Sequence, residues 1–276
     1  MSRSMSLLTL AAVMSGIMLA IGIIAYGPAS SFMSVEGLVI VVGGSIANAF
    51  LSFRRDDVRK AFSTIRHMLS ASIDGRERLR LDILRFIDWA YIVQQQDFIG
   101  LEKEGAKSRL EPLMRYGMDL TVTGYSAAII RDMMHTVADA EFEQGCAPVT
   151  VLRNMAATAP AFGMVGTLVG MILLLRNVGL DISNLGSGLG VAMLSTLYGI
   201  LAARLVCLPA ADKLLQQEET TRFSHYMLAE GFAMLAEKHS PYYMLDRLNS
   251  FLTPSKHFDL LKFERSSIQP SLAVAA

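Results

Sequence analysis

Residues 154–175 read NMAATAPAFGMVGTLVGMILLL, an apolar run without a charged side chain. Crossing the hydrocarbon core of a bilayer takes a helix of about 20 mostly apolar residues. Backbone polar groups find no water there, so a helix that satisfies its own hydrogen bonds is the expected form. The run therefore predicts a membrane-spanning helix over 155–176.

Three further runs are free of charge, at 4–35, 37–53 and 182–203. They predict membrane spans at 6–26, 34–53 and 187–209. Only 18% of the chain is charged and 52% is hydrophobic, whereas soluble domains carry about 25% charged residues. The composition thus favours a membrane protein over a soluble protein with buried core helices. The first run also exceeds the apolar core of a cleaved signal peptide, which is about 7–15 residues long.

Basic residues set the expected orientation. Arg54, Arg55, Arg59 and Lys60 directly follow the second span, and loops rich in lysine and arginine stay in the cytoplasm. Both termini are therefore expected in the cytoplasm. The fold class is expected to be all-α, a polytopic membrane protein with four transmembrane helices and a helical cytoplasmic domain. Its predicted parts are a transmembrane hairpin at 1–53, a cytoplasmic helical domain at 54–153, a second transmembrane hairpin at 154–210, and a cytoplasmic C-terminal helix and tail at 211–276.

The cytoplasmic domain is expected to be a compact bundle of short helices. Apolar residues recur at helical spacing within 79–91 and within 110–118. Gly75 and Gly124 indicate breaks between helices. The C-terminal segment is expected to be helical until Pro241 breaks it.

The sequence offers no catalytic or metal-binding pattern. Cys146 and Cys207 stand far apart in unrelated contexts, and the five histidines form no short metal-ligand spacing. No GxxxxGK[ST] phosphate loop occurs, and a net charge of zero gives no reason to expect nucleic acid as a partner. We therefore expect neither an enzyme nor a bound cofactor or metal.

The third span carries a stripe of small residues and a proline. Gly163, Gly166 and Gly170 lie on one face, where they suit close packing against another helix. Pro160 frees a backbone carbonyl near the inner end, a place for a bend or hinge. Pro209 stands near the inner end of the fourth span.

Hydroxyl groups in the last two spans are candidate cation ligands. Thr167 and Thr196 stand at comparable depth if the two spans run antiparallel, and Ser195 adjoins Thr196. Hard cations prefer such oxygen ligands. The alternative is that each hydroxyl bonds a carbonyl of its own helix and only packs.

Charged groups inside the spans are few. Glu36 begins the second span, where it either lines an ion entrance or stays at the wet interface. Arg204 is expected to extend toward the cytoplasmic headgroups. No acid stands deep in any predicted span, yet an ion route generally needs an ionisable group at mid-membrane. If the chain conducts ions, another polypeptide supplies the carboxylate.

Several sequence blocks together resemble a known family. They are APAFGMVGTLVG at 159–170, VIVVGGS at 39–45, LSTLYG at 194–199 and PxADKL at 209–214. In this order they are similar to the A subunit of the bacterial flagellar stator, of the MotA/PomA type, within the MotA/TolQ/ExbB proton channel superfamily. The resemblance extends to about residue 250, and the N-terminal hairpin favours the stator branch over TolQ and ExbB.

The resemblance implies an assembly and a mechanism. Five A subunits would surround a dimer of a MotB/PomB-type subunit in the bacterial inner membrane. That subunit would bring the membrane aspartate and a peptidoglycan-binding domain. Flow of Na⁺ or H⁺ would turn the A ring, whose cytoplasmic part would push on the rotor protein FliG. The alternatives are a TolQ/ExbB-like energiser of an envelope or transport machine, and a membrane scaffold that conducts nothing.

The resemblance also implies residue roles. Pro160 and Pro209 match prolines linked to gating and torque in the family. Thr167 and Thr196 match threonines associated with sodium in PomA-type stators, so sodium is favoured over protons. Glu36 matches an outer acidic position.

The stretch that would face the rotor departs from the family pattern. Its residues here are Gln94, Gln95, Glu102, Lys103 and Glu104. The two glutamines stand where the family has a basic pair. Electrostatic steering toward a rotor helix would therefore lack the positive charges that this pair provides. A nearby base, Arg85 or Lys107, would have to replace it.

Overall fold

The computed structural model describes residues 34–67, 75–107, 110–177 and 185–252. Every regular element within these segments is a helix, which confirms the all-α fold class. The predicted first span at 6–26, the turn after it and the tail beyond 252 lie outside the described residues.

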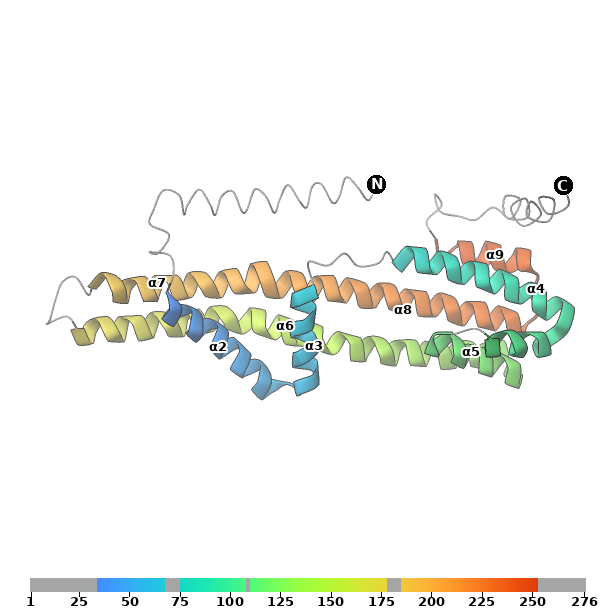
Figure 1. The fold of residues 1–276 in the computed structure, drawn as a ribbon, viewed down its shortest axis with the longest axis horizontal. Coiled ribbons are helices and arrows are strands. Elements are labelled where there is room, and N and C mark those ends of the chain that lie inside the picture. The colour runs from blue at the N-terminus through green and yellow to red at the C-terminus, as the bar shows by residue number, and fades with distance from the viewer. Residues whose placement is uncertain (1–33, 68–74, 108–109, 178–184, 253–276) are drawn as a thin grey trace. The chain divides into compact units, whose positions relative to one another are not determined.

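The helices of the described segments follow one another along the chain as shown in Figure 1. They are α2 (Val35–Ser52), α3 (Arg55–His67), α4 (Gly75–Lys107), α5 (Pro112–Thr123), α6 (Ala127–Asn177), α7 (Leu185–Leu201), the π-helix η3 (Ala202–Cys207), α8 (Leu208–Ala236) and α9 (Pro241–Asn249). Three described stretches are long and apolar enough to cross a membrane, namely Val35–Ser52, Ala127–Arg176 and Ala192–Ala236. They overlap the predicted spans at 34–53, 155–176 and 187–209.

The chain forms two compact units. The first joins residues 1–68 with 148–213, and the second joins 69–147 with 214–276. The expected bundle of short helices is wrong for α6, which has 51 residues, whereas α4 consists of two shorter helices that meet at Asp97. Pro148 removes only one hydrogen bond from α6, and buried Val149 and Leu152 keep the helical register beyond it.

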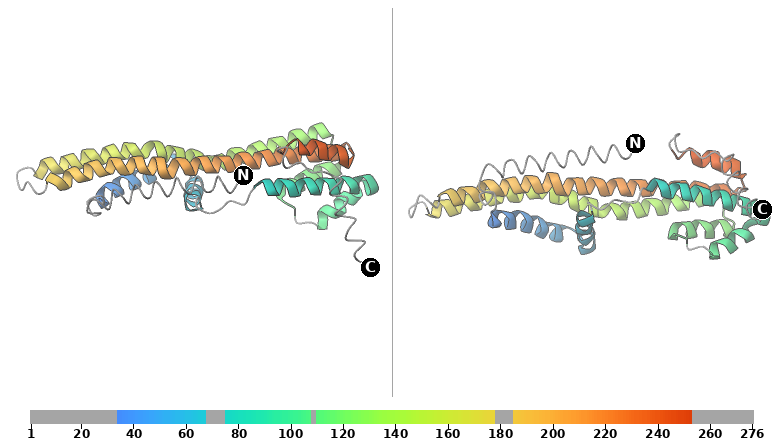
Figure 2. Two further views of the ribbon diagram at one scale, coloured as in Figure 1. Left: turned by 90° about the horizontal axis from the view of Figure 1, so that it is seen from above. Right: turned by 45° about the horizontal axis from the view of Figure 1, so that its top comes forward.

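In the first unit, α2 packs against both α6 and α7 (Figure 2). Asn48 of α2 donates a side-chain hydrogen bond to Asn154 of α6 at 2.8 Å. Gly44 of α2 faces the Phe162 ring so closely that a Cβ there would overlap it. Small residues thus let these helices approach each other, as expected for spans that associate in lipid.

In the second unit, aromatic side chains form the centre of the core. Phe86 and Trp89 of α4 meet Phe232 of α8 with ring centroids 4.9–5.7 Å apart. Gly124, with φ at +86°, ends α5 in the left-handed conformation that glycine adopts without cost. This confirms the predicted break, and Gly75 begins α4 as predicted.

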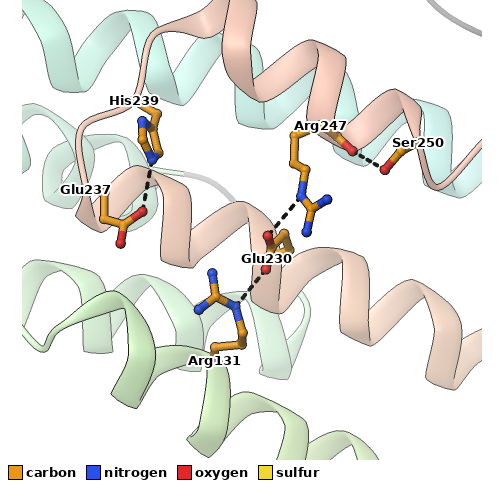
Figure 3. Close-up of polar contacts among 6 residues, drawn as sticks. All are labelled: Arg131, Glu230, Glu237, His239, Arg247 and Ser250. Atoms are coloured by element: carbon orange, nitrogen blue, oxygen red, sulfur yellow. Dashed lines mark hydrogen bonds and ion pairs between the residues drawn. The ribbon is translucent and has the colours of Figure 1, made fainter.

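A buried carboxylate ties three helices of the second unit together (Figure 3). Glu230 of α8 accepts hydrogen bonds from Arg131 of α6 at 2.7 Å and from Arg247 of α9 at 3.1 Å. Its side chain is 13% exposed. Burial alone would raise the pKa of Glu230, but the two arginine hydrogen bonds lower it below its ordinary value. The carboxylate is therefore charged and paired at neutral pH.

We expect Glu230→Gln to destabilise the folded chain by about 2 kcal/mol at neutral pH, because hydrogen bonds to charged groups contribute about 1.5–3 kcal/mol. Since the folded-state pKa is depressed, this stabilisation exists above the unfolded pKa and disappears as the pH falls through the folded one. Urea unfolding of the detergent-solubilised chain should show a deficit at pH 7 that closes in acid. Glu219→Gln, an exposed change on α8, is the control; an equal loss in both variants would contradict the role of the pair.

Candidate functional site

One side of the α6–α7 hairpin lies away from the contacts with α2 and carries Pro160, Thr167 and Thr196. On α6, residues 153, 157, 160, 164, 167 and 171 recur at spacings of four and three, so they share a face. Residues 189, 193, 196, 200 and 204 also recur at spacings of four and three, so they share a face of α7 and η3. We call these two stripes the open face. Asn154, Phe162 and Gly166, which contact α2 or pack beneath it, lie on a different side of α6.

The open face is apolar and exposed over most of its length. Met164 is 60% exposed and Met193 is 68% exposed. Where residues 153–160 run beside residues 200–208, the two helices border an open groove of about 580 Å³. It is lined by Arg153, Ala156, Ala157, Pro160, Ile200, Ala203, Arg204 and Leu208. An apolar surface of this kind, ending in arginines, needs lipid or a further helix to cover it.

Glycines hold the hairpin together behind this face. Ser195 is wholly buried and lies 3.3 Å from the Gly163 carbonyl and 3.0 Å from that of Ala192. A Cβ on Gly166 would come within 2.5 Å of the Ser195 Cβ. Gly170 is also buried. Ser195 therefore serves in packing here, and its place on an ion pathway stays a prediction.

The two threonines reach the open face about one helical turn apart. Thr196 lies opposite Gly163, with its hydroxyl 3.5 Å from the Gly163 carbonyl. Thr167 comes four residues later on α6, a rise of about 6 Å, and its hydroxyl donates to the Met164 carbonyl. Each hydroxyl donates a hydrogen bond to a backbone carbonyl, so the lone pairs of its oxygen remain available to a cation.

Two prolines alter the backbone near the groove. Pro160 has no N–H, so the Ala156 carbonyl, at the groove wall, loses its usual helical partner. Before Pro209, the chain widens into η3, where the Leu208 N–H donates to the carbonyl of Ala203 five residues back. Such π-turns are rare and often mark functional sites. Sequence reasoning missed η3; a proline inside a long apolar run was its signal.

Hydrogen bonds attach the start of α2, and with it Glu36, to α7. The N–H of Ser34, which caps α2, donates to the Tyr198 hydroxyl at 3.0 Å, and the Ser34 hydroxyl donates to Glu36 at 3.2 Å. Tyr198 stands 13 residues after Leu185, the first residue of α7, about 20 Å along the helix. The start of α2 thus meets the last turn of α7, and Glu36 is exposed beside it. Sequence reasoning had not singled out Tyr198 as the anchor.

The residues predicted to face a rotor surround a break in α4. Gln94 and Gln95 are exposed before it, and Glu102, Lys103 and Glu104 follow it in one helical segment. Asp97, at the break, accepts hydrogen bonds from Lys238 and from the Phe98 N–H, which hold the pKa of Asp97 below its ordinary value.

A basic residue that sequence reasoning missed lies close to these acids. Arg115 of α5 lines a groove of about 440 Å³ together with Glu102 and Asp119. Arg85, expected to compensate, instead pairs with Asp82 at 3.4 Å, and the side chain of Lys107 is outside the described residues. Arg115 therefore shares a groove with Glu102, whereas Arg85 is paired elsewhere.

Within the described segments, no group of three or more His, Cys, Asp or Glu side chains is placed to hold a metal ion. The two stripes of the open face, all of whose residues are described, offer hydroxyl and backbone carbonyl oxygens and no carboxylate.

Comparisons with known proteins point in one direction. Residues 105–225 match the model of the MotA/TolQ/ExbB proton channel family. The chain is 31% identical to protein YtxD of Bacillus subtilis (strain 168) over 79% of this chain and 80% of that protein. It is 28% identical to the chemotaxis protein PomA of Vibrio alginolyticus, covering 83% and 88%. A chain of the C. jejuni MotAB structure matches with a TM-score of 0.78 at 20% identity, covering 91% and 97%, and so shares the fold.

Proposed function

The chain belongs to the MotA/TolQ/ExbB proton channel family, and from this premise we propose that it is the A subunit of a flagellar stator. In this role it forms one wall of a cation pathway and converts ion flow into torque. We infer that it acts in the bacterial inner membrane as a pentamer with both termini in the cytoplasm. The relatives named for motility or chemotaxis support the flagellar assignment.

The observation that carries the proposal is the open face. It combines exposed apolar residues with two hydroxyls, yet no carboxylate belongs to its two stripes. A cation crossing there requires a charged partner. We propose that a MotB/PomB-like dimer covers the face, supplies the aspartate and anchors itself to peptidoglycan.

The proposal is tested by deleting the gene for this chain and re-expressing it with and without the companion. Loss of swimming that only the pair restores is the expected result. A deletion strain that swims normally would defeat the flagellar role. Should that strain show a defect in its envelope or in nutrient uptake, the TolQ/ExbB-like function would apply instead. Gln94 and Gln95, which lack the charge expected for steering to FliG, favour this second candidate.

We propose sodium as the coupling ion, with Thr167 and Thr196 as oxygen ligands. Thr167→Ala should raise the sodium concentration that gives half-maximal swimming speed by about fivefold, the equivalent of losing one ligand interaction of about 1 kcal/mol. Swimming speed against sodium concentration, with a protonophore present, measures it.

The matched control is Thr158→Ala, because Thr158 bonds its own helix at Asn154 and lies outside the open face. It should leave the sodium dependence unchanged. Speed that never depends on sodium, in wild type or variant, would assign the pathway to protons.

A further inference from the structure

Two strained residues meet at the break in α4. Among non-glycine residues of the described segments, only Asp97 (φ +58°, ψ −163°) and Lys238 (φ +56°) have positive φ. The conformation of Asp97 approaches a region that is essentially reserved for glycine. Strained backbone persists only where surrounding contacts enforce it, so the contacts of these two residues decide what holds the break.

Lys238 takes the place that glycine usually fills after a helix. Beyond the end of α8, its N–H donates to the Leu235 carbonyl and the His239 N–H donates to that of Met234. This is the Schellman arrangement, in which the left-handed residue is normally glycine. A lysine there turns a long cationic side chain toward α4.

The two side chains bind each other. Lys238 Nζ lies 2.9 Å from Asp97 Oδ1 and 3.0 Å from Oδ2, so it contacts both carboxylate oxygens. The same ammonium stands 4.9 Å from the centroid of the Phe98 ring, a cation–π distance. Asp97 also accepts the Phe98 N–H at 2.9 Å. One lysine thereby contacts the break and the first residue beyond it.

The segment beyond the break carries the acids predicted to face the rotor. Leu101 is fully buried and ties this segment to the core, and Gly105 packs closely against the Met118 side chain of α5. On its exposed side, Ile99 is 66% exposed, and Glu102, Lys103 and Ala106 follow at spacings of three, four and seven residues, all exposed. The backbone angle at Asp97 acts together with these contacts in setting the direction in which this surface is presented.

We propose that Asp97 and Lys238 are positioning residues: their ion pair is a clasp that holds the segment 98–107 in one orientation for contact with the rotor. This inference rests on the proposed function, since it assigns a role to the rotor-facing surface. The clasp joins the end of α8 to α4, so any displacement of α8 relative to α4 acts directly on that surface.

Hydrogen exchange of the complete complex in membranes, read by mass spectrometry on peptides covering 92–107, tests the clasp. In Lys238→Met and Asp97→Ala, amides of 98–107 should exchange about threefold faster, because an exposed ion pair stabilises modestly and the segment opens more often once released. Asp97→Gly should fall between these and wild type, since glycine accepts the backbone of the break without the ion pair. Asp246→Ala, an exposed carboxylate on α9, should match wild type.

Swimming speed of the same strains separates the clasp from the function. Faster exchange together with slower swimming supports the proposal. Unchanged exchange in Lys238→Met and Asp97→Ala overturns it, even if swimming is lost, because the side chains would then contact the partner directly. Faster exchange with normal swimming also overturns the positioning role. If the complex drives no swimming even in wild type, the proposed function fails while the exchange result still reports on the clasp.

Discussion

Replacing Gly199 by valine is expected to force α6 and α7 apart and to abolish swimming. A Cβ at this position would lie 2.6 Å from the Ala159 carbonyl oxygen and 3.1 Å from the Pro160 Cα. Both are backbone atoms, so no rotamer change on α6 relieves the overlap. Overpacking in cores typically costs about 1–3 kcal/mol, and we expect the upper end here. Thermal unfolding of the purified chain in detergent and swimming of the strain measure the effect.

Gly43→Ala is the control for adding a side chain to a membrane helix. Nothing lies within 4 Å of a Cβ on Gly43, and alanine is a better helix former than glycine by about 1 kcal/mol. This variant should be as stable as wild type or slightly more so. If Gly199→Val unfolds at the same temperature as Gly43→Ala, the close approach of α6 and α7 is not what stabilises the first unit.

The spans could be predicted from the sequence because their signal is local. Runs without charge longer than about 17 residues leave little choice but a membrane helix, and α2 begins and ends within one residue of the predicted 34–53. The glycine stripe likewise predicted close packing. The stripe did not reveal which residues it would pack against. Ser195 fills the space beside Gly163 and Gly166, and Gly199 of the LSTLYG block makes the tightest approach to backbone among the described glycines.

The depth of side chains was harder to predict, because it depends on how the helices are staggered. Counting residues from the ends of two spans placed Thr167 and Thr196 level, but η3 adds a widened turn below Thr196, and the packing of Gly163 on Thr196 sets the register. Glu36 shows the same effect, since the Ser34–Tyr198 hydrogen bond fixes where α2 begins along α7.

The break in α4 had no local signal at all. Aspartate is not a residue that sequence rules place at φ +58° in the interior of a helix. Its partner Lys238 is 141 residues away in sequence, so only the folded second unit brings the two together. Long-range contacts of this kind decide orientation, and a single sequence does not disclose them.

Pro160→Leu is expected to stop torque while leaving the complex assembled. Leucine restores an N–H that can bond the Ala156 carbonyl, and its branched side chain extends into the groove that Pro160 and Ala156 line. The first change stiffens the helix at this point, and the second narrows the groove at the inner end of the open face. The binding surface that we propose for the companion extends along the rest of that face, so assembly should persist. Swimming should fall to zero, while the companion co-purifies at wild-type yield.

Two further variants separate the causes. Pro160→Ala restores the N–H without filling the groove, so partial torque with Pro160→Ala and none with Pro160→Leu would show that both effects contribute. Pro148→Ala makes the same backbone change on α6 twelve residues earlier, outside the groove, and should leave torque unchanged. If the companion no longer co-purifies with Pro160→Leu, the proline supports assembly rather than ion-driven movement, because a blocked pathway alone does not release a helix that packs on the exposed methionines of the open face.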